Sequence, residues 1–180
     1  WHPLFHGYLY KIKDMVLFLH RLGWFVFLVL LQVLVLNHVH ILGYATPMLY
    51  IYYILILNAE TPRKSLLLQA FFIGLCIDIF SNTPGMNAAA ATMMAFTRRP
   101  LLRMQMLRDV TDDYVPGIRS MGFYPFFRYV LSETVVFIMT LQVIDAFTFF
   151  RMSELMWKIL TDTLMTIVGI ICIDTIRRKK

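Results

Sequence analysis

The stretch Phe71–Asn87, FFIGLCIDIFSNTPGMN, decides the fold class, because it places an acid inside an apolar helix that ends at a Pro-Gly turn. A carboxylate costs about 2.5–3.5 kcal/mol at the centre of a membrane helix and less near its end, so Asp78 needs a compensating contact. Gly74 lies four residues earlier and shares a helical face with Asp78. A glycine beside the acid lets another helix backbone come close. The pair therefore predicts a site of helix packing or partner contact.

Two positions of the Asp78 carboxylate fit this pattern. In the first, it faces the protein interior and takes part in polar contacts there. In the second, it lies at the outer water interface and caps the end of its helix, since the turn begins only about four residues later.

The composition indicates an all-α integral membrane protein. Apolar residues make up 59% of the chain and charged residues 16%, whereas a soluble domain has about 45–50% and 25%. Residues 15–180 are predicted to form a single polytopic membrane domain, and residues 1–14 are set apart as an N-terminal segment. The net charge of +6 does not indicate nucleic-acid binding, because the basic residues lie at the ends of apolar runs. Cys76 and Cys172 lie in apolar runs and are interpreted as small buried residues.

Apolar runs predict about six transmembrane helices in one compact bundle. The expected bounds are Leu22–Leu42, Met48–Asn58, Leu66–Phe80, Ala88–Phe96, Phe126–Phe147 and Leu155–Asp174. The second run is shorter than the roughly 20 residues that a crossing helix needs. The alternative is five crossings, with either the second or the fourth run re-entrant. Its tyrosines, Tyr50, Tyr52 and Tyr53, are predicted to form an aromatic belt at a membrane interface.

Small residues place the fourth run at the centre of the bundle. Four consecutive alanines, Ala88 to Ala91, follow the turn at Pro84 and Gly85. Small side chains allow close packing between helices in lipid, within the chain or with a partner. We expect this helix to continue past Phe96 until Pro100 bends or breaks it.

The most charged part of the chain is Arg98–Arg119. Two interpretations are open for its basic residues: a topology signal on a solvated loop, or a docking surface for a cytoplasmic partner. The residues concerned are Arg98, Arg99, Arg103 and Arg108. If six spans cross, the positive-inside rule places this cluster, both termini and nearly all other basic residues on the cytoplasmic side.

The remaining polar residues give no catalytic or metal-binding pattern. His38 and His40 are two residues apart and so lie on different faces of a helix. Lys158 precedes Asp162 by four residues, and a pair along one helical face is a structural explanation for this acid. With no phosphate-binding loop and no nucleophile–base pair, neither an enzyme nor a metal or cofactor is expected.

Several blocks, in order along the chain, resemble the rod shape-determining protein MreD family. They are LQVLVLNHVHILGYATPMLYIYYILIL (31–57), GLCIDIFSNTPGMNAAAATMMAF (74–96), RPLLR (99–103) and GIRSMGF (117–123). The resemblance runs from about Phe25 to the C-terminus and leaves out residues 1–14. Its most specific part is Gly-x-x-x-Asp, at Gly74 and Asp78, followed by the Pro-Gly turn.

This resemblance implies a non-enzymatic scaffold in the bacterial inner membrane, which helps to direct lateral peptidoglycan synthesis and to maintain rod shape. The implied partners are an MreC-like bitopic protein, an MreB-like filament, and a RodA-like glycosyltransferase with its transpeptidase. The implied fold is similar to the substrate-binding S components of energy-coupling-factor transporters. The alternative function is therefore small-solute binding near the outer face, to which Tyr50, Tyr52, Asn82 and Asn87 would contribute.

Overall fold

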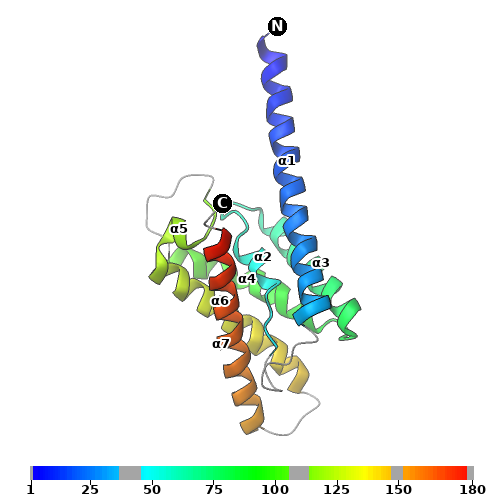
Figure 1. Ribbon diagram of the computed structural model, residues 1–180, viewed down its shortest axis with the longest axis vertical. Helices are drawn as coiled ribbons and strands as arrows, with labels where there is room; N and C mark the ends of the chain where they lie inside the picture. Colours follow the sequence, from blue (N-terminus) through cyan, green and yellow to red (C-terminus); the bar gives the residue numbers. More distant parts are fainter. Residues whose placement is uncertain (1, 37–45, 106–113, 147–151, 178–180) are drawn as a thin grey trace.

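The computed structural model describes residues 2–36, 46–105, 114–146 and 152–177, and every regular element within them is helical (Figure 1). The long elements are α1 (His2–Leu31), continued by the π-helix η1 (Gln32–Leu36), α3 (Arg63–Ser81), α4 (Met86–Gln105), α6 (Phe123–Ala146) and α7 (Met152–Arg177). The short helices are α2 (Ile51–Leu55) and α5 (Ile118–Met121). The predicted all-helical fold class is confirmed.

Three helices in the described part of the chain are long and apolar enough to cross a membrane. They are Arg63–Ser81, Phe123–Asp145 and Leu155–Arg177, of 19, 23 and 23 residues. At 1.5 Å per residue, each measures about 28 Å or more, close to the roughly 30 Å of a hydrocarbon core. Leu19–Leu34 adds a shorter apolar stretch.

The first helix begins earlier than the sequence predicts. It is continuous from His2, so residues 2–14, which the sequence set apart, belong to the same helix as the first apolar run. Figure 1 shows the start of α1 projecting beyond the rest of the molecule, toward the same end at which α7 finishes. The predicted end of the first span, Leu42, lies outside the described residues.

The fourth helix lies at the centre of the fold, as its alanines predict. Helix α4 packs against α3 on one side and α6 on the other, and α6 packs against α7. Ala90 and Ala91 have no exposed surface. The helix also continues through Pro100 to Gln105 instead of ending there.

The second apolar run does not form a crossing helix. It contains only the five-residue α2, about 7.5 Å long, inside a buried stretch, Thr46–Leu57, which we call the inner segment. This stretch runs alongside α7 in the same direction. Its contacts advance together with that helix: Thr46 N to Asp162 Oδ1 (3.0 Å), Met48 N to Thr166 Oγ1 (3.1 Å) and the Tyr52 hydroxyl to Asp174 Oδ1 (2.9 Å).

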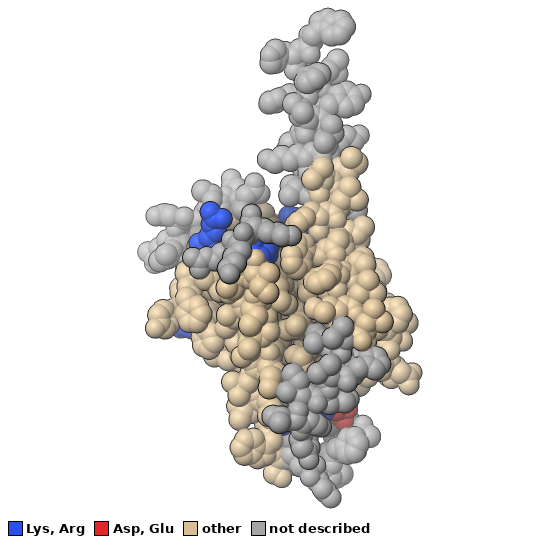
Figure 2. All heavy atoms as spheres, viewed as in Figure 1, with Lys and Arg blue, Asp and Glu red and all other residues tan. Residues whose placement is uncertain are grey.

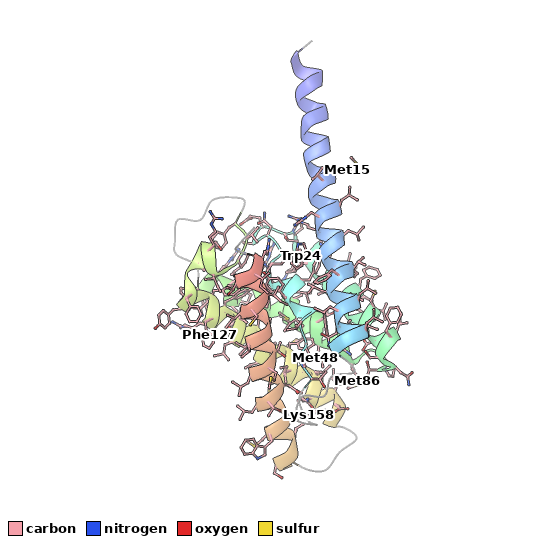
Figure 3. The ribbon with its side chains drawn as sticks, in the orientation of Figure 1. Met15, Trp24, Met48, Met86, Phe127 and Lys158 are labelled. Atoms are coloured by element: carbon pink, nitrogen blue, oxygen red, sulfur yellow. The ribbon has the colours of Figure 1, made fainter. Side chains whose placement is uncertain are left out.

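From Asp162 to Asp174 the inner segment follows about 18 Å of the α7 axis. Figure 3 shows the same direction: Met48 lies in the half of the molecule that holds Met86 and Lys158, whereas Trp24 lies toward the other end, near α2. Irregular backbone is tolerated at membrane depth only where protein surrounds it, because its N–H and C=O groups need partners. The neighbouring helices therefore have to supply those partners.

The tyrosines of the inner segment do not form the predicted interfacial belt. Tyr50, Tyr52 and Tyr53 are at most 6% exposed. Their hydroxyls donate to Asn87 Oδ1 (2.7 Å), Asp174 Oδ1 (2.9 Å) and Gln69 Oε1 (2.8 Å), respectively. The belt prediction is wrong because hydrogen-bond acceptors inside the bundle replace water as partners for these hydroxyls.

Candidate functional site

The Asp78 carboxylate lies where α3 ends and α4 begins, and it is 4% exposed. It accepts hydrogen bonds from the Thr83 hydroxyl (2.8 Å), the Asn87 side-chain amide (2.9 Å) and the backbone N–H groups of Asn87 and Ala88 (2.9 Å each). Of the two positions open from the sequence, the interior one is therefore observed. Asp78 caps a helix, but this helix is α4 rather than its own.

The turn between the two helices explains why an acid is needed there. Gly85 accepts the first hydrogen bond of α4, from Ala89 N (3.0 Å), at a positive φ of 79°. Having no side chain, it cannot cap the first N–H groups, which have no partner inside a helix. Asp78 supplies the missing acceptor from α3, and its negative charge suits the positive end of the helix dipole.

Gly74 brings the two helices close enough for this contact. A Cβ atom at Gly74 would lie 2.5 Å from the Asn87 carbonyl oxygen and 2.6 Å from the Ala88 Cα atom. The close approach expected at this glycine is present, between α3 and α4 of the same chain. Ala88 and Ala91 are buried, whereas Pro84 and Gly85 lie exposed on the turn.

A second layer of contacts joins this cap to the inner segment. The Asn87 side-chain amide donates to the Thr83 hydroxyl (3.1 Å) as well as to Asp78. The Asn87 side-chain oxygen accepts from Tyr50 (2.7 Å). One polar cluster thus connects the end of α3, the start of α4 and the residue that precedes α2.

Arg98 is not on the surface predicted for it. This arginine has no exposed area and lies inside α4, about three turns after the Asp78 cap. Its guanidinium donates to the Tyr129 hydroxyl (3.0 Å) and to the carbonyl oxygens of Leu55 (3.3 Å) and Leu57. The Leu55 carbonyl is the last of α2, and the Leu57 carbonyl lies two residues beyond that helix. The last carbonyls of a helix have no partner within it. The docking prediction for Arg98 is therefore wrong, since the arginine binds the end of the inner segment.

A buried acid accompanies this arginine. Glu133, one turn after Tyr129 on α6, has no exposed area and accepts a long hydrogen bond from the Thr97 hydroxyl (3.4 Å). Arg98 Nη1 and Glu133 Oε1 have no hydrogen-bond partner in the described part of the chain. The printed hydrogen bonds therefore satisfy each of these two buried side chains only in part.

The other basic residues of the predicted cluster are dispersed. The Arg99 guanidinium, partly buried, donates to the Thr61 carbonyl (2.7 Å) just before α3. Arg103 is exposed on the last turn of α4. Arg108 lies outside the described residues. Of these four arginines, Arg103 is thus the described one that keeps a solvent-facing role.

Two acids on α7 hold the inner segment, and one of them was not singled out from the sequence. Asp162 accepts from Thr46 N (3.0 Å) and from the Gln142 amide (3.1 Å). Asp174 accepts from the Tyr52 hydroxyl (2.9 Å) and from Ile118 N (3.0 Å). A signal was present, because Asp162, Thr166 and Asp174 repeat at multiples of four residues and share one helical stripe.

Two further predictions are corrected. Lys158 forms its ion pair with Asp145 (3.4 Å) and not with Asp162, whose carboxylate is turned inward to Thr46 and Gln142. Cys172 is exposed rather than buried, and Cys76 is partly buried. His38 and His40 lie outside the described residues. Among the described residues, no group of three His, Cys, Asp or Glu side chains is placed to hold a metal ion.

Four buried charged side chains thus bind backbone groups of neighbouring elements: Asp78, Arg98, Asp162 and Asp174. Comparison of the chain with protein-family models, with curated proteins and with solved structures gives no match in any of the three.

Proposed function

We propose that the chain is a non-enzymatic scaffold of the cell-elongation complex in the bacterial inner membrane, as the resemblance to the MreD family implies. Its partners are then a bitopic MreC-like protein, an MreB-like filament and a RodA-like glycosyltransferase with its transpeptidase. The observation that supports the proposal is that buried charged side chains bind the backbone of this chain. Asp78, Arg98, Asp162 and Asp174 all bind backbone groups of this chain. They stabilise one arrangement of helices, which a scaffold needs.

Partner contacts are then left to the outer faces of the helices. Helix α3 exposes large apolar side chains along its length. The residues are Leu68, Phe71, Phe72, Ile79 and Phe80. Such a face suits lipid or the transmembrane helix of a partner. In this proposal Gly74, Asp78, Ala88 and Ala91 act on partners indirectly, by fixing α3 against α4, whereas Pro84, Gly85 and Arg103 are accessible to partners.

The proposed topology has six passes, of which the buried inner segment is one and the long helices are the other five. The proposal places one set of helix ends on the cytoplasmic side, and most described basic residues belong to them. These residues are Arg63, Lys64, Arg99, Arg103, Arg119 and Arg177. Lys158 belongs to the opposite end, beside Asp145. Both termini are then cytoplasmic.

The alternative, a vitamin-type S component, has less support. Tyr50 and Asn87 are hydrogen-bonded to each other and at most 5% exposed. The Tyr52 hydroxyl is bound to Asp174. Asn82 is exposed at the end of α3, where its positive φ of 54° serves the turn. Three of the four side chains expected to line a ligand site are thus engaged in the core.

Co-purification tests the proposal. The tagged full chain is isolated from native membranes in mild detergent, and its partners are identified by mass spectrometry. Recovery of a bitopic coiled-coil protein and a multi-span cell-wall synthase supports the scaffold. Recovery of a pair of ATPases with a coupling membrane subunit replaces it with the transporter.

A charge reversal adds a test of the exposed basic residue. Arg103→Glu changes a solvent-facing side chain, and we expect it to reduce recovery of cytoplasmic partners while membrane insertion is retained. Asp145→Asn, at the other end of the molecule, is the matched control. Equal recovery from both variants and from the unchanged chain would exclude a docking role for Arg103.

A further inference from the structure

A cavity of about 460 Å³ lies between α5 and the last turn of α7. It is lined by Val115, Pro116, Gly117, Arg119, Ser120, Asp174 and Arg177. Its volume falls within the roughly 300–1,000 Å³ of small-molecule sites. The residues that line this cavity are not among those proposed to contact the partners of the scaffold.

The donor groups of this cavity are cationic, and one of them, the Arg177 guanidinium, also hydrogen-bonds to the Tyr52 hydroxyl. Both Asp174 oxygens already accept hydrogen bonds, from the Tyr52 hydroxyl and from Ile118 N. The Ser120 hydroxyl donates to the Val115 carbonyl (2.7 Å). Arg119 is exposed and forms no hydrogen bond or ion pair with another described residue. With Arg177 and Asp174, it gives the described lining residues a net charge of +1.

The cavity lies at the depth in the membrane at which lipid headgroups are expected. Its residues lie at the ends of two candidate spans, just before Phe123–Asp145 begins and where Leu155–Arg177 finishes. Phe123 and Tyr124, at the start of α6, are 52% and 79% exposed, as expected for aromatic residues at a membrane interface. In Figure 2, Lys and Arg side chains are visible at the end where α5 and α7 meet, and the visible acidic side chain lies at the opposite end.

We propose that this cavity binds a phosphate group, with the Arg119 and Arg177 guanidiniums as its donors. Guanidinium groups match phosphate oxygens in a bidentate geometry. Basic pockets at helix ends on the cytoplasmic side suit anionic phospholipid headgroups, and a soluble phosphate compound presents the same chemistry. This inference concerns a different site from the proposed scaffold contacts and stands without them.

Native mass spectrometry of the full chain in a neutral detergent tests the proposal. The probes are phosphatidylglycerol, phosphatidylcholine as the zwitterionic comparison, and inorganic phosphate. Arg119→Gln changes an exposed side chain that forms no hydrogen bond or ion pair with another described residue, so we expect the fold to be retained. Arg103→Gln is the matched control, because it removes the same charge from another exposed helix end.

Phosphatidylglycerol is expected to bind more tightly than phosphatidylcholine, and Arg119→Gln to weaken that binding about tenfold or more, the usual effect of losing a charge-assisted hydrogen bond. Arg103→Gln should leave it within about twofold. Displacement of the lipid by millimolar inorganic phosphate, with the same dependence on Arg119, would assign the site to a soluble phosphate. Equal losses in both variants, or equal binding of the two lipids, would overturn the proposal.

Discussion

Removing the Asp78 carboxylate tests the central contact of the fold. In Asp78→Ala, four donors lose their acceptor: the Thr83 hydroxyl, the Asn87 amide and the backbone N–H groups of Asn87 and Ala88. Side-chain hydrogen bonds in a membrane protein average about 0.6 kcal/mol, so the four together contribute about 2.4 kcal/mol. Loss of a helix N-cap alone costs about 0.5–2 kcal/mol, and this variant also removes the acceptor of two side-chain donors. We expect the free energy of unfolding to fall by about 2–3 kcal/mol.

The assay is unfolding of the full chain in mixed micelles of dodecyl maltoside and SDS, followed by tryptophan fluorescence. Asp78→Asn provides an intermediate, since its amide keeps one acceptor oxygen and turns an NH₂ group toward the donors. Its loss should be about half that of the alanine variant.

Asp145→Asn is the matched control for this series. Its carboxylate side chain is 39% exposed and pairs with Lys158 at 3.4 Å, and exposed ion pairs contribute about 0–1 kcal/mol. The reasoning is refuted if Asp78→Ala unfolds within about 0.5 kcal/mol of the unchanged chain. A loss in Asp145→Asn equal to that in Asp78→Ala would also refute it, because burial would then not matter.

Two further variants are measured in the same way. Gly74→Ala places a Cβ atom 2.5 Å from the Asn87 carbonyl oxygen, so the α3 and α4 backbones must separate, which should cost about 1–3 kcal/mol of stability. The control is Gly23→Ala, where nothing lies within 4 Å, and it should be neutral or stabilising by up to about 1 kcal/mol. Equal changes in stability in the two variants would reject the packing argument. Arg98→Ala leaves the Leu57 carbonyl without its guanidinium donor and the Leu55 carbonyl with the Tyr129 hydroxyl alone, and it should cost about 3–5 kcal/mol. Exposed Arg103→Ala should stay within about 0.5 kcal/mol. A neutral Arg98→Ala would show that the inner segment does not depend on this arginine.

The sequence predicted the bounds of α3, α6 and α7 to within a few residues, but it predicted the inner segment poorly. Met48–Asn58 is as apolar as a spanning helix, but apolarity alone does not distinguish a lipid-facing helix from irregular backbone inside a bundle. The distinction depends on whether distant side chains supply partners for its N–H and C=O groups. Asp162, Arg98 and Tyr129 do so here from three different helices.

Within the candidate site, too, some residues could be predicted from the sequence and others could not. Gly74 and Asp78 were predicted together because helical periodicity is local: residues four apart share a face whatever surrounds them. Arg98 was misplaced because a charge followed by Pro100 resembles a solvated helix end, and its burial depends on carbonyls more than 40 residues away in the chain. The partner of Lys158 was misassigned because Asp145, with which it pairs, lies on α6, whereas Lys158 lies on α7.

The sequence by itself determined that the chain is apolar and helical, that a glycine and an acid share one face before a tight turn, and that α4 is the central helix. These properties follow from composition, side-chain size and a period of 3.6 residues, all of which are local. Only the tertiary structure decided which end of which helix Asp78 caps, that Arg98 is interior, and that the second apolar run lies buried along α7. Each of these depends on a hydrogen bond between elements far apart in the chain, and the direction of such a bond is fixed only when the helices pack.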